Sequence, residues 1–342
     1  MKGLLRNIKR ICTVAFAAAL PLLAAAAPPK VAPRCLTECT PRIGIVSAFG
    51  AEADLLVEQT HGARTYTING NRFTLGTLRG NRVVIVLSGV SMVNSAMVTQ
   101  LLIDHFRVER LVMSGIAGGV NPMHHVGDVI VPERWSMPLE IYWSADSGTP
   151  APCGTPGDVQ CLGLKLASGE SGPLPPFELA SSGVPVPTGL FMRETFVRNA
   201  INGPDGEFRF DYPADPAMVE VARRIEPELT RCGPRPPQRC VSTQPRVFVG
   251  GRGVSGPAFL ANPQYRNYLF EVLQAQAFEM ETAALAHVAY ANRIPYIAFR
   301  SLSDLAGASE FNEDVGALFS SGLAEANEAA VTLAFLEAWR KR

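Results

Sequence analysis

Beyond its first ten residues, the 342-residue sequence has no cluster of lysine and arginine, which argues against a nucleic-acid-binding surface. It has no Cys-x-x-Cys pair, and no histidine stands at ligand spacing from a cysteine, which argues against a metal site. Internal repeats, a Walker-type lysine and the glycine spacing of a dinucleotide fingerprint are also missing. We therefore expect no metal, no cofactor and no nucleic-acid partner.

The amino terminus joins a basic start to an apolar, alanine-rich stretch at 11–27, the pattern of a secretory signal peptide. An uncleaved membrane anchor is the alternative, but the stretch is short for a spanning helix and ends in small residues. We predict a signal peptide over 1–27 and a proline-rich linker over 28–41. We also predict a secreted or periplasmic location, with no membrane contact after cleavage.

Six of the seven cysteines follow this leader, and an even number in an exported protein suggests disulfide bonds. They form three close sequential pairs, although other connectivities exist in principle. The predicted pairs are Cys35–Cys39, Cys153–Cys161 and Cys232–Cys240. The last two lie in stretches rich in proline and glycine, where a covalent link stabilises the chain most.

Strand-like and helix-like segments alternate along much of the chain. Apolar runs predict strands at 42–48, 82–87, 110–113, 128–131, 245–250, 277–280 and 294–299. Apolar spacing predicts helices at 52–59, 91–106, 263–274, 281–287 and 315–342. The segment 65–78 alternates and contains Asn69-Gly70, a hairpin signal. Hairpins mixed with βα units predict a three-layer α/β/α sandwich with a mixed central sheet.

The range from about 134 to 245 differs in composition. It is rich in proline, glycine and serine, with weak periodicity. One amphipathic segment, 216–229, predicts a helix. We interpret the range as a long irregular insertion over one edge of a single domain that spans 42–342.

Two acids stand at the ends of neighbouring strand-like runs. Glu281 follows the run at 277–280 and begins a helix-like segment, and Asp304 lies past the run at 294–299. Ligands of open α/β sheets bind outside the carboxyl ends of strands, so the two acids predict a site. The glycine-rich segment Ser114–Gly119 predicts a turn after a strand, where backbone N–H groups approach a ligand closely.

Four segments in this order resemble the nucleoside phosphorylase/nucleosidase superfamily. They are Ile43-Gly44-Ile45 with Glu52, Gly115–Gly119 with Val126–Val129, Phe278-Glu279-Met280-Glu281, and Ser303-Asp304. Within the superfamily they look like bacterial methylthioadenosine/S-adenosylhomocysteine nucleosidases. The stretches 131–136, 252–255 and 297–307 are more similar to the secreted plant bark storage proteins. The resemblance covers about 42–135 and 245–340 and implies a nucleoside phosphorylase-like fold.

The resemblance also implies hydrolysis of the N-glycosidic bond of a purine nucleoside. Asp304 matches the acid that protonates the departing base, and Ser303 would orient it. Glu52 matches the carboxylate that activates water. Such a bond breaks through an oxocarbenium-like sugar, and the acid needs a raised pKa to act near neutral pH.

Five further residues match positions that bind the substrate. Glu281 would accept hydrogen bonds from the ribose hydroxyls, and Met280 would pack against the sugar. Phe259 would stack on the base. Gly118 and Ile116 belong to the glycine-rich segment of the site. Ile116 stands where bacterial nucleosidases commonly carry serine, and the storage-protein branch shares this isoleucine.

Each of these residues also has a purely structural interpretation. Glu52 suits the first turn of a helix, where the helix dipole favours an acid. Asp304 suits a helix N-cap, Glu281 could simply begin a helix, and Phe259 could belong to the core.

The nucleophile and the activity have alternatives as well. Family phosphorylases hold the phosphate dianion with arginine, but the corresponding stretch Ser88–Ser95 has none, and Glu52 would repel phosphate. Both observations favour water. The alternatives are a phosphate-dependent phosphorylase and a secreted nucleoside-binding or storage protein with little activity. The resemblance further implies that the chain can form a homo-oligomer.

Overall fold

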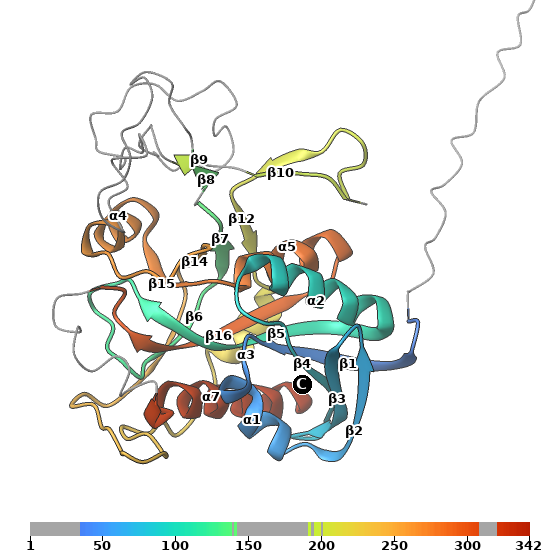
Figure 1. Cartoon of the computed structure of the whole chain (residues 1–342), viewed down its shortest axis with the longest axis horizontal. Helices are drawn as coiled ribbons and strands as arrows, with labels where there is room; N and C mark the ends of the chain where they lie inside the picture. The colour runs from blue at the N-terminus through green and yellow to red at the C-terminus, as the bar shows by residue number, and fades with distance from the viewer. Residues whose placement is uncertain (1–34, 139, 142–190, 193–194, 200, 308–319) are drawn as a thin grey trace, which may run out of the picture. The chain divides into compact units, whose positions relative to one another are not determined.

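The computed structural model describes residues 35–138, 140–141, 191–192, 195–199, 201–307 and 320–342 (Figure 1). These residues include a 12-stranded mixed sheet. Its strands are β1 (Glu38–Ser47), β2 (His61–Ile68), β3 (Asn71–Leu78), β4 (Asn81–Leu87), β5 (Phe106–Gly119), β6 (Val129–Val131), β7 (Arg134–Ser136), β12 (Asp211–Pro213), β13 (Val247–Val249), β14 (Arg252–Ser255), β15 (Ala275–Glu279) and β16 (Tyr296–Asp304). The order is β12-β7-β14-β15-β5-β1-β4-β3-β2, and β16 pairs with β5 and β6.

Helices cover both faces of this sheet. They are α1 (Gly50–Glu58), α2 (Met92–His105), α3 (Pro216–Ala222), α4 (Pro263–Leu273), α5 (Thr282–Asn292) and α7 (Leu323–Arg340). Helices α2 and α5 pack together on one face, and α1 and α7 pack together on the other (Figure 1). The predicted three-layer α/β/α sandwich with a mixed central sheet is therefore confirmed.

The central strands are apolar along their length because helices cover both faces of the sheet. In β4 the run Val83–Val86 is buried on both faces, as expected for strands with a helical layer on each side. Strands β2 and β3 form the predicted hairpin, and both Asn69 (φ 46°) and Gly70 (φ 77°) take the positive φ of a tight hairpin turn.

The prediction that Ser114–Gly119 forms a turn is wrong. Strand β5 continues through this segment, pairing in parallel with β16 and, at Gly118 and Gly119, antiparallel with β15. The glycines instead make room for side chains. A Cβ on Gly115 would lie 2.5 Å from Oε1 of Glu52, and one on Gly118 would lie 2.8 Å from Oδ1 of Asp304.

The range 134–245 is not one irregular block. Its first residues form β7, which pairs in the main sheet with β12, a later part of the same range. Helix α3 ends at Ala222, so it is shorter than the helix predicted over 216–229. Two short strand pairs, β8 (Glu140–Ile141) with β9 (Phe191–Met192) and β10 (Thr195–Val197) with β11 (Glu207–Arg209), stand apart from the sheet. Residues 139, 142–190, 193–194 and 200 of this range lie outside the described residues.

Two of the three predicted cysteine pairs fall within the described residues. The structure joins Cys35 to Cys39 at the start of β1, and Cys232 to Cys240 in the segment between α3 and β13. Cys153 and Cys161 lie outside the described residues. None of the helices in the described part of the chain is long and apolar enough to cross a membrane.

Candidate active site

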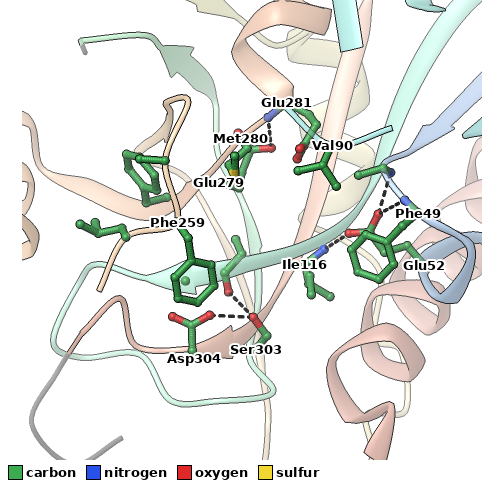
Figure 2. A pocket seen from close by; sticks show the side chains of 16 residues that line it. Phe49, Glu52, Val90, Ile116, Phe259, Glu279, Met280, Glu281, Ser303 and Asp304 are labelled. Carbon is green, nitrogen blue, oxygen red and sulfur yellow. Dashed lines mark hydrogen bonds between the residues drawn. The ribbon is translucent and has the colours of Figure 1, made fainter. Parts of the chain in front are cut away.

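One pocket brings all the predicted site residues together. It lies where the carboxyl ends of β1, β5, β15 and β16 meet the loop after β14 (Figure 2). Ligands of α/β sheets bind at such strand ends. The predicted residues that line it are Glu52, Ile116, Gly118, Phe259, Met280, Glu281, Ser303 and Asp304.

Asp304 is the last residue of β16 rather than the first residue after it. Its Oδ2 accepts a hydrogen bond from Ser303 Oγ at 2.9 Å, and its Oδ1 accepts one from the N–H of Ala306 at 2.8 Å. The next residues, 305–307, are not helical, so the N-cap interpretation fails. Burial raises the pKa of Asp304, although both hydrogen bonds oppose the shift. The carboxyl group is therefore placed to hold a proton.

Glu281 occupies the N-cap position of α5, but its side chain makes no capping hydrogen bond. Its Oε1 accepts from the N–H of Ser91 at 2.7 Å, and its Oε2 lies 3.4 Å from Nη2 of Arg300. Burial, and then the charge of Glu279, raise the pKa of Glu281 to about 7 against the effects of Arg300 and Ser91. Glu281 thus begins a helix and still presents its carboxylate to the pocket.

Glu52 lies in the first turn of helix α1 and also lines the pocket. Its Oε2 accepts from the N–H groups of Ala48 at 2.6 Å and Phe49 at 3.2 Å. Its Oε1 accepts from the N–H of Ile116 at 2.9 Å, which ties α1 to β5. Burial raises the pKa of Glu52, although Arg300 and these three donors oppose the shift.

Arg300 pairs with three acids of the pocket, although none of the sequence motifs pointed to it. Its side chain is 0% exposed; Nη1 lies 3.8 Å from Oε1 of Glu52, and Nη2 pairs with both Glu279 and Glu281. Burial alone would lower the pKa of Arg300, but the surrounding carboxylates outweigh burial and raise it. A lone arginine inside the apolar run of β16 was the available signal, because buried charges need partners. We call Glu52, Glu279, Glu281 and Arg300 the Arg300 cluster.

The opposite end of the pocket is aromatic. Phe259 is 62% exposed, so the structure does not place it in the core. Figure 2 shows its ring beside the carboxyl group of Asp304. Ile116 lies between Asp304 and Glu52 in this view. We call Phe259, Ser303 and Asp304 the Phe259 end. Here a flat apolar surface adjoins a group that can donate a proton.

The described residues contain no group of three or more histidine, cysteine, aspartate or glutamate side chains that could hold a metal ion. Carboxyl groups, a hydroxyl group and aromatic rings line the pocket, and three of its carboxylates pair with the buried Arg300.

The family model of the phosphorylase superfamily matches residues 42–337, which is most of the chain. This chain belongs to the phosphorylase superfamily. A curated superfamily relative, the 5′-methylthioadenosine/S-adenosylhomocysteine nucleosidase of Bacillus cereus (strain G9842), is 24% identical over 268 residues, covering 78% of this chain and 87% of that protein.

Solved superfamily structures share the fold. The 5′-methylthioadenosine/S-adenosylhomocysteine nucleosidase from S. pneumoniae, with a transition-state inhibitor, aligns with TM-score 0.57 and 23% identity, covering 88% of this chain and 100% of that one. The futalosine hydrolase of Helicobacter pylori strain 26695 aligns with TM-score 0.55 and 18% identity, covering 90% of this chain and 98% of that one.

Proposed function

We propose that this superfamily member hydrolyses the N-glycosidic bond of a purine nucleoside, with water as the nucleophile. One observation carries the proposal: a single pocket is lined by a buried acid beside an aromatic ring at one end and, at the other, by Glu52, Glu279 and Glu281, which pair with the fully buried Arg300. Cleavage of a glycosidic bond needs a proton for the leaving group, and charge to stabilise an oxocarbenium-like sugar. The two ends can supply these separately.

The base occupies the Phe259 end. Phe259 stacks on the purine, and Asp304, oriented by Ser303, donates its proton to the N7 edge as the bond between C1′ and the base breaks. The electron pair of that bond leaves with the base. The raised pKa of Asp304 supports this role because the group must be protonated before it can donate.

The sugar and the water occupy the other end. The Glu281 carboxylate accepts hydrogen bonds from the ribose hydroxyls, and Met280 packs against the ring. Glu52 accepts a proton from the water whose oxygen bonds to C1′. The proton on Glu52 then passes to solvent, and Asp304 takes one up from solvent, so the products are free ribose (or its 5′-substituted form), the base and restored side chains.

Charge favours water over phosphate. Among the described residues, Arg300 is the cation paired with the pocket acids, and Glu52, Glu279 and Glu281 surround it. A phosphate dianion would meet net negative charge there, whereas a positively charged ribosyl centre would be stabilised by it.

The proposed substrate is a 5′-substituted purine nucleoside such as methylthioadenosine or S-adenosylhomocysteine. The names of the relatives support this choice, together with the apolar side chains Phe49, Val90 and Ile116 along the pocket. The sequence pattern of the leader supports a secreted or periplasmic enzyme.

The test is an assay of purified protein lacking residues 1–27, using methylthioadenosine, S-adenosylhomocysteine, adenosine and inosine, with and without phosphate. We expect release of the base at the same rate in both buffers. Release that requires phosphate and yields ribose 1-phosphate would make the protein a phosphorylase. No release from any nucleoside, with binding retained, would make it a binding protein.

A further inference from the structure

The start of helix α5 is capped by residues other than its N-cap. The first N–H groups of a helix lack partners within the helix and need acceptors. Glu279 provides them: its Oε2 accepts from the N–H of Glu281 at 3.1 Å and from the N–H of Thr282 at 2.9 Å. Ser255 Oγ accepts from the N–H of Ala283 at 2.8 Å and donates to Glu279 Oε1. The side chain of Glu281 is therefore not needed as a cap.

The same carboxylate holds Arg300. Nη2 of Arg300 pairs closely with Oε2 of Glu279 and lies farther, at 3.4 Å, from Oε2 of Glu281. Thr282 Oγ1 accepts from Nε of Arg300 at 3.1 Å and donates to Glu279 Oε2 at 2.8 Å. Glu279 thus binds the guanidinium group and the helix start together, and Arg300 makes only its weaker contact with Glu281.

Glu281 lies among several ionisable groups. They are Glu279 on β15, Arg300 on β16 and Glu52 on α1, with Asp304 at the other end of the pocket. Glu328 on α7, which bonds to Ser114 of β5, interacts with Glu52 and Arg300. The neighbouring α2 side contributes the uncharged donors Ser91 N–H and Ser95 Oγ, which bond to the carboxylate and the carbonyl of Glu281. Among the ionisable groups, Glu279 is the one whose side chain bonds to the backbone N–H of Glu281.

We propose that Glu279 is a positioning residue: by capping α5 and holding Arg300, it keeps the Glu281 carboxylate uncapped, weakly paired and available to a ligand in the pocket. The identity of that ligand, a sugar carrying hydroxyl groups, rests on the proposed function. The arrangement of Glu279, Arg300 and Glu281 is independent of the proposed function.

Glu279→Gln separates charge from shape. The glutamine keeps an oxygen that accepts from the helix start but removes the negative charge beside Glu281, so Arg300 loses its ion pair with residue 279. Arg300 then pairs with Glu281. Both changes favour the ionised form of Glu281, so its titration midpoint should fall by about one pH unit or more. The acid limb of the kcat/KM profile should move down with it.

The experiment titrates the Glu281 carboxyl directly by NMR in protein labelled with ¹³C at the glutamate side-chain carboxyl carbon, and the signal is assigned with Glu281→Gln. Ser255→Ala is the matched control, because it removes a capping hydrogen bond without changing charge. We expect Ser255→Ala to lower the melting temperature and to leave the Glu281 midpoint unchanged. A wild-type midpoint in Glu279→Gln, or an equal shift in Ser255→Ala, would overturn the inference.

Two features keep this test decisive. If Glu279→Gln does not fold, Glu279→Asp retains the charge on a shorter side chain. It should keep the Glu281 midpoint and raise KM, and a displaced midpoint would count against the inference. The titration does not depend on turnover. A wild-type protein that releases no base would overturn the proposed function while the titration still decides the role of Glu279.

Discussion

The two ends of the pocket differ in how strongly folding fixes them. In the Arg300 cluster the exposed fractions are 0% for Arg300, 1% for Glu52, 4% for Glu281 and 5% for Glu279. At the Phe259 end, Ser303 and Asp304 are also buried, at 3% and 4%, but Asp304 is held by Ser303 and one backbone N–H, and Phe259 is 62% exposed. Charge is therefore preorganised where the sugar would bind, because these ions must be paired for the chain to fold. The surface for the base is shaped by fewer contacts.

Removing the proton donor at the Phe259 end should have the largest effect on activity. Asp304→Asn keeps the size of the side chain but cannot supply a proton, so base release should fall about 10³-fold. Binding of adenine, measured by calorimetry, should change little, because Phe259 and the rest of the pocket remain. Undiminished release in this variant would show that Asp304 is not the acid.

Removing the cation should affect the Arg300 cluster through stability. Arg300→Met leaves Glu52, Glu279 and Glu281 buried without their counter-charge, so the free energy of unfolding should fall by about 3–5 kcal/mol. Arg107→Met is the control, since that side chain is 49% exposed and its ion pair with Glu109 is worth less than about 1 kcal/mol. Equal losses in the two variants, measured by urea unfolding, would contradict the expectation that folding depends on the Arg300 cluster.

Truncating the exposed ring should affect binding rather than folding. Phe259→Ala removes the stacking surface, so KM should rise by roughly 10-fold, in line with about 1–3 kcal/mol for stacking on a base. Because the ring is 62% exposed, the melting temperature should stay close to that of the wild type. Phe299→Ala, at a fully buried ring that packs on Phe335, should show the reverse pattern. A large stability loss in Phe259→Ala would place that ring in the core.

Local patterns in the sequence were enough to predict most of the fold. Apolar runs and helical spacing predicted the central strands and helices, and Asn69-Gly70 predicted the hairpin because its conformation depends on adjacent residues. The segment Ser114–Gly119 was misjudged for the opposite reason. Its glycines leave space for the side chains of Glu52, Arg300 and Asp304. Because these residues are distant in sequence, the residues around 114–119 alone do not reveal why glycine is needed there.

The same limit applies to the site. Motif order predicted which residues share the pocket, but Arg300 acquires its importance from acids on α1 and β15 that only the folded chain brings near it. Nor does the sequence say that Glu279 and Ser255 cap α5 and so leave the side chain of Glu281 uncapped. The catalytic roles of these residues stay predictions until the variants are measured.

The pH dependence of binding should give the smallest effect and test the ionisation of the Arg300 cluster. The pKa of Glu281 is raised to about 7, so the carboxyl group is mostly protonated below that pH and accepts hydrogen bonds poorly. KM should therefore fall as pH rises from 6 to 8, by up to roughly tenfold, because ionised Glu281 then holds the sugar. Burial also raises the pKa of Asp304, so kcat should fall as pH rises through that pKa and the acid loses its proton. Glu281→Gln should abolish the change in KM with pH while keeping the fall in kcat that follows the loss of the Asp304 proton. An unaltered KM profile in that variant would assign the acid limb to another group and leave the sugar anchor without support.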